Sequence, residues 1–117
     1  MKEVLTGRVI CKGKVKGIAR VINSYDDLDK VEKDEIIIAS QTDMNYTPYL
    51  QRCSGLITET GSRYCHAAIY SRENNIPCIT GVKNARLLID GGIELVLDAN
   101  KNEVYTKQQN ETDKLTE

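Results

Sequence analysis

The chain alternates short apolar runs with polar breaks, a pattern typical of a small domain built mainly from short strands. Segment 35–39, Glu-Ile-Ile-Ile-Ala, contains a short continuous apolar run, which predicts a strand covered on both faces. The remaining predicted strands are rich in Val, Ile and Leu: two within 3–23, then 55–59, 78–80, and a closing hairpin of 93–98 and 103–106. Val and Ile favour strands, so we expect a small β-branched core.

Helical signals fall between these strands. The polar segment 24–34 predicts a loop with one helical turn, and Pro48 suits the first turn of a short helix within 40–53. A helix of roughly ten residues should begin near His66 and stop at Asn74–Asn75, before Pro77. Segment 84–89 is the last helical one. The fold class is therefore α/β, a mixed sheet of short strands with a few helices. We expect one domain over 1–106 and a polar tail or linker over 107–117.

Charge excludes some partners. The 117 residues carry 16 Lys and Arg against 17 Asp and Glu, a formal net charge of −1. Neither nucleic acid nor an anionic membrane is attracted by such a balance. No apolar stretch reaches the ~20 residues that span a bilayer, and the N-terminus lacks the pattern of a signal peptide. We therefore expect a cytoplasmic protein without nucleic-acid or membrane partners.

The four cysteines, Cys11, Cys53, Cys65 and Cys78, form no C-x-x-C pair. That spacing favours reduced, mostly buried thiols, and we predict no metal site. One alternative is a metal held by Cys65, His66 and a distant cysteine, for which the spacing is unspecific.

His66 is the only histidine, and two interpretations compete for it. A lone histidine is most often structural. A helix start, however, presents unpaired N–H groups and the positive end of the dipole, which favour a bound anion and a neutral imidazole. The small neighbours Gly61, Ser62, Ala67 and Ala68 leave room for an approaching group. A neutral imidazole that accepts a phosphoryl group would use all three features.

Residues 60–81, TGSRYCHAAIYSRENNIPCITG, resemble the phosphohistidine motif of the PEP-utilising enzymes. That family includes phosphoenolpyruvate synthase, pyruvate phosphate dikinase, rifampin phosphotransferase and Enzyme I of the sugar phosphotransferase system. The matching positions are Gly61, His66, Ala68, Ile69, Arg72, Glu73, Ile76, Pro77 and Gly81. The upstream segment resembles the family's T-D-P-x-x-T-P motif through Thr42, Asp43, Thr47 and Pro48, and the whole resemblance covers about 4–106.

This chain departs from the family pattern at four positions. Ser62 replaces a glycine, Met44 a proline, Cys65 a serine or threonine, and Asn102 a turn glycine. None of these removes the histidine. Cys65 puts in doubt any regulation that modifies a hydroxyl at its position.

The resemblance implies a swivelling β/β/α phosphohistidine domain in which His66 takes a phosphoryl group from a nucleotide or phosphoenolpyruvate and hands it to a second acceptor. Arg63 either contacts phosphate or is a solvated arginine, and Thr60 and Ser62 either donate hydrogen bonds to phosphate or shape the turn. The resemblance assigns structural positions in the motif to Gly61, Arg72, Pro77, Gly81 and Thr42. For Arg72 we expect an ion pair, with Glu59 or Asp90 as its partner.

A nucleotide cradle and a magnesium-binding set are missing from the sequence, so we predict a carrier that cannot charge itself. It should bind no cofactor. Mg²⁺ and ATP or phosphoenolpyruvate belong on partner domains: a nucleotide-binding (ATP-grasp-like) domain, a phosphoenolpyruvate/pyruvate-binding domain, or both, in the same chain or a separate subunit. One alternative is a docking or regulatory module that is never phosphorylated. Another, a Cys65–His66 thiol hydrolase, is disfavoured because adjacent helical residues point in different directions.

Overall fold

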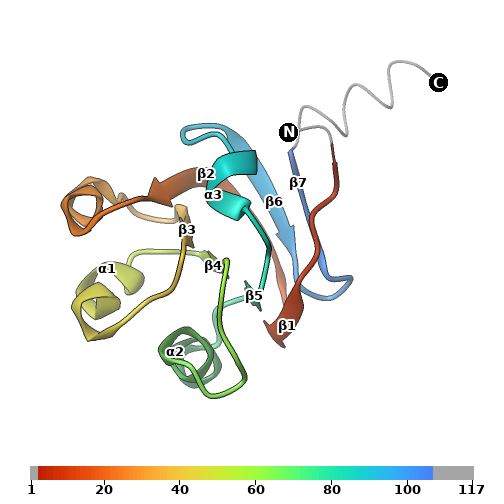
Figure 1. Cartoon of the computed structure of the whole chain (residues 1–117), viewed down its shortest axis with the longest axis horizontal. Helices are drawn as coiled ribbons and strands as arrows, with labels where there is room; N and C mark the ends of the chain where they lie inside the picture. Colours follow the sequence, from red (N-terminus) through yellow and green to blue (C-terminus); the bar gives the residue numbers. More distant parts are fainter. Residues whose placement is uncertain (1–2, 107–117) are drawn as a thin grey trace.

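The computed structural model describes residues 3–106 as a curled sheet with short helices on its outside (Figure 1). The predicted polar tail, 107–117, lies outside the described residues. The seven strands are β1 (Arg8–Cys11), β2 (Lys14–Ile22), β3 (Ile36–Ala39), β4 (Gly55–Thr58), β5 (Cys78–Thr80), β6 (Glu94–Asp98) and β7 (Glu103–Thr106). Each predicted strand is present. Their order in the sheet is β1-β5-β4-β3-β2-β6-β7, with β2, β3, β4 and β5 parallel and the other pairs antiparallel.

The helices also fall where the sequence predicts them. They are the 3₁₀ turns η1 (Tyr25–Lys30) and η2 (Met44–Tyr46), and the α-helices α1 (Thr47–Leu50), α2 (His66–Asn74) and α3 (Ala85–Leu88). Within residues 3–106, none of them has the length and apolar character needed to cross a bilayer.

The two ends of the sheet meet. Leu5, just before β1, exchanges two backbone hydrogen bonds of 2.9 Å with Val104 of β7. Beside this bridge, the side-chain amide of Asn102 accepts from the Gly7 N–H at 3.0 Å and donates to the Gly7 carbonyl at 2.8 Å. Asn102 has φ +58°, as the family's glycine at this position suggests. The sheet therefore curls far enough for the segment before β1 to form a bridge with β7.

Strand β3 shows why the apolar run at 36–39 has no polar alternation. Ile36 and Ile38 belong to a core inside the curled sheet, whereas Ile37 and Ala39 belong to a second core beneath the helices. Successive strand residues face opposite sides, so a strand covered on both faces must be apolar throughout. Helices α1 and α2 contribute Leu50 and Ala67 to the second core, which fixes α2 against the sheet.

The parallel strands β3 and β4 end side by side, and the segments that follow them remain hydrogen-bonded to each other. The Glu59 N–H donates to the Ala39 carbonyl and the Thr60 N–H to the Ser40 carbonyl, both at 3.0 Å. The segment after β3 therefore lies against the turn that leads from β4 into α2.

A partly buried ion pair joins β2 to Glu35, the residue just before β3. Arg20 donates two hydrogen bonds to Glu35, at 2.9 and 2.8 Å, and the Glu32 N–H donates a third at 2.7 Å. Burial alone would raise the pKa of Glu35, but these hydrogen bonds outweigh it and hold the pKa below its ordinary value.

We expect this pair to make stability depend on pH. A depressed carboxyl pKa stabilises the fold above the unfolded-state pKa, about 4.3, and the benefit is lost as the pH falls through the folded-state value. Glu35→Gln should lower the free energy of unfolding by about 1–3 kcal/mol at pH 7, and by much less near pH 3. Urea unfolding at both pH values measures this, with the exposed Glu73→Gln as control. An equal loss at both pH values would contradict the assignment.

Candidate functional site

His66 is the first residue of α2, as the sequence predicts. Cys65 precedes it in an extended conformation and makes no side-chain hydrogen bond to the first turn of the helix. At the other end, Asn75 adopts the left-handed conformation with φ +56°, and the Ile76 N–H donates to the Ser71 carbonyl at 2.9 Å. This is a standard helix end, which Asn accommodates well.

The imidazole of His66 is half-buried and lies between two threonine hydroxyls. The Thr42 Oγ1 lies 2.8 Å from Nδ1, and the Thr47 Oγ1 lies 3.3 Å from Nε2. The Tyr70 ring stacks nearby, with 6.2 Å between ring centroids. Both hydroxyls come from the segment after β3, whereas His66 comes after β4. Two connections that are separate in sequence therefore meet at one ring.

Each hydroxyl can donate or accept, so either ring nitrogen can carry the hydrogen. If Nδ1 carries the hydrogen and donates to Thr42, the lone pair of Nε2 faces the Thr47 hydroxyl. Thr42 is buried and its contact is the shorter, while Thr47 is half-buried. Of the two ring nitrogens, Nε2 therefore has the longer contact and the less buried partner.

Asp43 fixes the segment that carries both threonines. Its carboxylate accepts from the Asn45 N–H at 2.9 Å, a contact that caps the start of η2. It also accepts from the Tyr25 hydroxyl. The Tyr25 hydrogen bond, opposed by desolvation, lowers the pKa of Asp43, with smaller contributions from the Asn45 amide and the charged form of His66. The same hydrogen bond raises the pKa of Tyr25. An anionic carboxylate thus lies close enough to His66 to interact with its charge.

The residues predicted to contact phosphate lie in the turn before α2. The Thr60 hydroxyl donates to the Ser40 carbonyl at 3.1 Å and so ties the two connections together. Ser62 is exposed, and its hydroxyl oxygen accepts from the Tyr64 N–H at 3.2 Å. Within residues 3–106 the exposed Arg63 guanidinium makes no hydrogen bond or ion pair. Contact of these three with phosphate stays a prediction.

Comparison with known proteins gives the family. The model for the PEP-utilising enzyme, mobile domain, matches residues 31–102. The chain belongs to this family. It is similar to the phosphoenolpyruvate synthase of Deinococcus radiodurans, with 35% identity over 94 residues, which are 80% of this chain and 12% of that protein. It is also similar to the rifampicin phosphotransferase of Bacillus subtilis, with 38% identity over 88 residues, 75% of this chain and 10% of that protein. The chain thus spans about an eighth of the length of the curated relatives it matches.

Solved structures show the same fold at low identity. A solution structure of Enzyme I matches with a TM-score of 0.59 and 23% identity, covering 81% of this chain and 39% of that one. Aconitase X of Thermococcus kodakaraensis matches with a TM-score of 0.66 and 16% identity, covering 89% of this chain and 98% of that one. The Enzyme I match confirms the predicted α/β fold class, a mixed sheet of short strands with a few helices.

Two motif glycines and the motif proline of this mobile domain have clear structural roles. Gly61 has φ +140°, and a Cβ there would lie 3.0 Å from the Cys65 sulfur. Gly81 has φ +69°. Pro77 packs against Gly13, where a Cβ would come within 2.6 Å of the proline ring.

The predicted ion pair of Arg72 with Glu59 or Asp90 is wrong. The Arg72 guanidinium donates to the Arg63 carbonyl instead, so it links α2 to the turn that precedes the helix. Glu59 is occupied by Arg86, whose Nε and backbone N–H both donate to it at 2.9 Å. The start of α3 offers that carboxylate a second, fixed donor, which the more distant Arg72 cannot supply.

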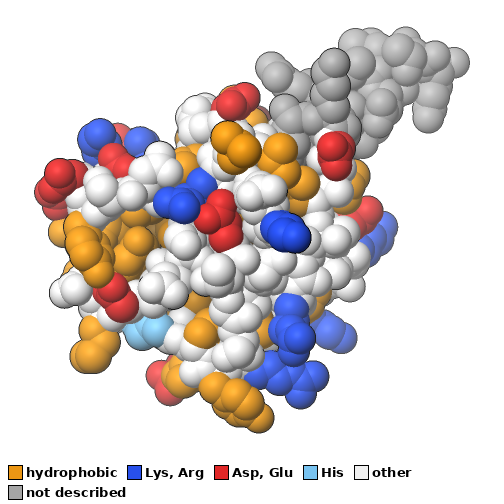
Figure 2. Space-filling view, viewed as in Figure 1, with side chains coloured by type: hydrophobic (Ala, Val, Ile, Leu, Met, Phe, Trp, Pro, Cys, Tyr) orange, Lys and Arg blue, Asp and Glu red, His pale blue; other side chains and the backbone are white. Residues whose placement is uncertain are grey.

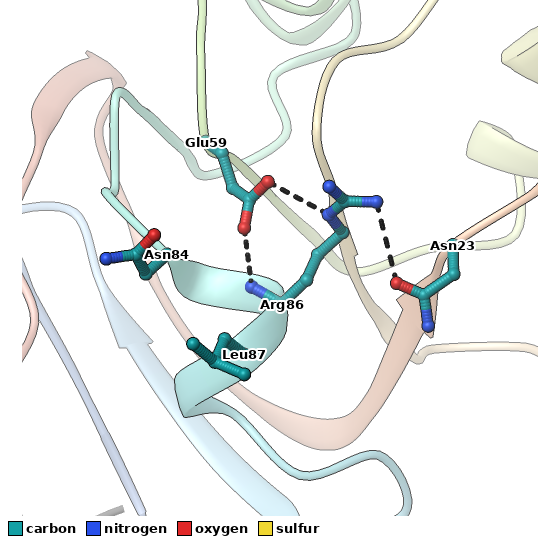
Figure 3. A pocket seen from close by; sticks show the side chains of 5 residues that line it. All are labelled: Asn23, Glu59, Asn84, Arg86 and Leu87. Atoms are coloured by element: carbon teal, nitrogen blue, oxygen red, sulfur yellow. Dashed lines mark hydrogen bonds and ion pairs between the residues drawn. The ribbon is translucent and has the colours of Figure 1, made fainter.

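This Glu59–Arg86 pair lines a hollow of about 450 Å³ together with Asn23, Asn84 and Leu87 (Figure 3). The sequence gives no signal for it. Its charged groups are turned toward each other, and His66 is not among its lining residues. The hollow is therefore separate from the histidine site.

All four cysteines are free thiols, as predicted, but the expectation that they are mostly buried is wrong, since only Cys78 is buried and the other three are half-buried. Burial raises the pKa of Cys53 to about 11 and that of Cys78 to about 12. The Cys65 thiol donates to the Ser62 carbonyl at 3.1 Å and makes no hydrogen bond to His66, which leaves the thiol-hydrolase alternative without its required contact. Within residues 3–106, no three His, Cys, Asp or Glu side chains are grouped to hold a metal ion.

We expect Cys65→Ser to leave phosphoryl transfer within a few-fold of the parent. Serine can make the same hydrogen bond to Ser62, and it is a better N-cap residue, so the free energy of unfolding should stay level or rise by up to about 1 kcal/mol. Urea unfolding and the transfer assay described below measure the two effects. Complete loss of transfer in Cys65→Ser would show that the thiol takes part in the chemistry.

Proposed function

We propose that this chain is the phosphoryl carrier of a PEP-utilising phosphotransferase of the dikinase type. His66 accepts a phosphoryl group from a nucleotide or phosphoenolpyruvate and passes it to an acceptor site on another domain or subunit. The observation that carries this proposal is the single imidazole at the start of α2, with both ring nitrogens against the Thr42 and Thr47 hydroxyls. A cytoplasmic location accords with it.

In the proposed step, the Nε2 lone pair of neutral His66 attacks phosphorus while Nδ1–H donates to Thr42. An N–P bond forms, and the P–O bond to the donor breaks with its electron pair leaving on the donor oxygen. The product ring keeps Nδ1–H and carries a positive charge, so Nε2 is a good leaving group when the next acceptor attacks. The Thr47 hydroxyl, freed from Nε2, can then donate to a phosphoryl oxygen.

The start of α2 suits the charge of the transferred group. N–H groups of the first helical turn are not capped by the Cys65 side chain, and the helix dipole adds positive potential there. Ser62 and Arg63 lie in the adjoining exposed turn and are the candidates to bind the phosphoryl oxygens. Thr60 is a weaker candidate because its hydroxyl already donates to Ser40.

Partner domains must supply the rest of the reaction. The matched relatives are far longer than this chain, and they include phosphoenolpyruvate synthases. We assign Mg²⁺ and ATP to a nucleotide-binding (ATP-grasp-like) domain and phosphoenolpyruvate to a phosphoenolpyruvate/pyruvate-binding domain. Rigid-body movement of the carrier between them would complete the cycle.

The first test is phosphorylation of the purified chain with ATP and Mg²⁺, or phosphoenolpyruvate and Mg²⁺, with and without partner domains of a related enzyme. Label should appear only with a partner, be lost in acid and survive base, as expected for an N–P bond. His66→Ala should take up none and remain folded, with a change in unfolding free energy of about 1 kcal/mol or less. Label that persists in His66→Ala, or that resists acid, would place the phosphate elsewhere.

A second test concerns the reacting nitrogen. Thr42→Val removes the acceptor for Nδ1–H, and we expect transfer to fall about tenfold or more, since one hydrogen bond to a charged ring is worth about 1.5–3 kcal/mol. Thr42→Ser, the matched control, should restore most of the rate. Nitrogen-15 NMR of the labelled imidazole should place the phosphoryl group on Nε2. A phosphoryl group on Nδ1, or equal rates in the two variants, would refute this role for Thr42.

A further inference from the structure

Tyr25 reaches from one connection of the sheet into the segment that contacts His66. It is the first residue of η1, which follows β2, whereas Asp43 follows β3. The Tyr25 hydroxyl donates to the Asp43 carboxylate, and its ring packs edge-on against Tyr46, with 5.9 Å between ring centroids. Tyr46 is buried in the second core. Tyr25 is therefore fixed at both its ring and its hydroxyl.

Asp43 is the residue through which this contact bears on the histidine. One of its carboxylate oxygens accepts from Tyr25, and the other accepts from the Asn45 N–H at 2.9 Å. Asp43 directly follows Thr42, and η2 then leads to Thr47, the second threonine that contacts the ring. The two donors lie on different segments, so together they fix the backbone between the two threonines.

The start of η2 has few restraints of its own. Met44, its first residue, is 82% exposed, and within residues 3–106 the Met44 N–H donates to no backbone carbonyl. A 3₁₀ turn of three residues makes few internal hydrogen bonds, and their geometry is poorer than in an α-helix. The Tyr25 hydroxyl therefore supplies a restraint from outside this segment, at the residue beside Thr42.

The imidazole needs such a restraint because it lies in a wet place. Figure 2 shows the pale blue histidine at the surface, with red acidic and orange apolar side chains beside it. Water there competes with the two threonine hydroxyls for the ring nitrogens. The ring keeps one orientation only if both hydroxyls stay in place.

We propose that Tyr25 is a positioning residue for the histidine site. Its hydroxyl holds Asp43, and Asp43 holds the two threonine hydroxyls against the imidazole. Its part in phosphoryl transfer rests on the proposed function above, whereas its effect on the ring does not. Tyr25 lies outside the residues that the family model matches, 31–102, so the family match alone does not point to it.

A second tyrosine offers a matched control. The Tyr49 hydroxyl donates to the Asp29 carboxylate at 2.9 Å, and this contact also joins η1 to the segment after β3. In both pairs the hydrogen bond to a carboxylate raises the pKa of the tyrosine. Tyr49→Phe thus removes the same kind of hydrogen bond between the same two segments, but not the one at Asp43.

The first measurement needs no phosphoryl donor. Nitrogen-15 NMR of the His66 imidazole at about pH 8.5, where an ordinary histidine is neutral, reports the hydrogen bonds of the ring. We expect Tyr25→Phe to move both ring-nitrogen signals toward those of a solvent-exposed histidine, and Tyr49→Phe to leave them unchanged. Asp43→Ala should move them as well. Adding Tyr25→Phe to Asp43→Ala should move them no further, because the hydroxyl acts through that carboxylate.

The second measurement is label transfer from phosphoenolpyruvate and Mg²⁺ with partner domains of a related enzyme. The rate at saturating carrier should fall about threefold to tenfold in Tyr25→Phe, as for one hydrogen bond that water can partly replace, and stay level in Tyr49→Phe. The carrier concentration that gives half-maximal rate should stay level in both variants, because the change affects the ring and not the binding of the partner.

The outcomes separate this role from the carrier function. Unchanged imidazole signals in Tyr25→Phe, equal shifts in the two tyrosine variants, or a further shift in the double variant would overturn the positioning role. A wild-type transfer rate in Tyr25→Phe would overturn its part in the reaction. If the signals shift as expected but wild-type His66 takes no label, the carrier function fails while the positioning of the ring stands.

Urea unfolding shows whether Asp43→Ala is folded, and Met44→Pro takes its place if it is not. Proline suits the first position of η2, where the N–H is unused and the preceding Asp43 is extended. Because proline fixes the backbone at this point, adding Met44→Pro to Tyr25→Phe should return the imidazole signals to their wild-type positions. Signals that stay shifted in this double variant would show that Tyr25 does not act by holding the start of η2.

Discussion

The side-by-side ends of β3 and β4 are the constraint on which the site depends. The backbone hydrogen bonds from Glu59 to Ala39 and from Thr60 to Ser40 continue the parallel pairing beyond the strands. They bring the segment that carries Thr42 and Thr47 to the start of α2, although His66 is 24 residues from the first threonine. A one-residue slip of this pairing would turn every β3 side chain to the opposite face and would separate the threonines from the ring.

The elements were predictable because their signals are local. The uninterrupted apolar run at 36–39 and the Asn-Asn-Ile-Pro end of α2 each carry their own physical reason, and both are present in the structure. The two threonine contacts were not predictable from the residues alone, although the Thr42–Pro48 segment was singled out as a motif. They depend on which connections the sheet places together, and no local pattern encodes that.

Arg72 is a second case in which the local sequence does not determine a side-chain contact. Its sequence spacing permits several acidic partners, and the choice is made by where α2 and α3 point relative to β4. Glu59 turns toward the first turn of α3, where a backbone N–H and a guanidinium meet it together. Arg72, left with a backbone carbonyl, instead joins the turn before His66 to its own helix. The motif singles out Arg72 as a structural position, while only the tertiary structure gives its contact.

The environment of His66 balances opposite charges at its two sides. The start of α2 favours the anionic phosphoryl group, while Asp43 lies near enough for the charged ring to lower its pKa. Tyr25 and the Asn45 N–H hold the carboxylate in place. In the proposed function, the helix start and the fixed carboxylate would act on opposite charges, that of the phosphoryl group and that of the phosphorylated ring.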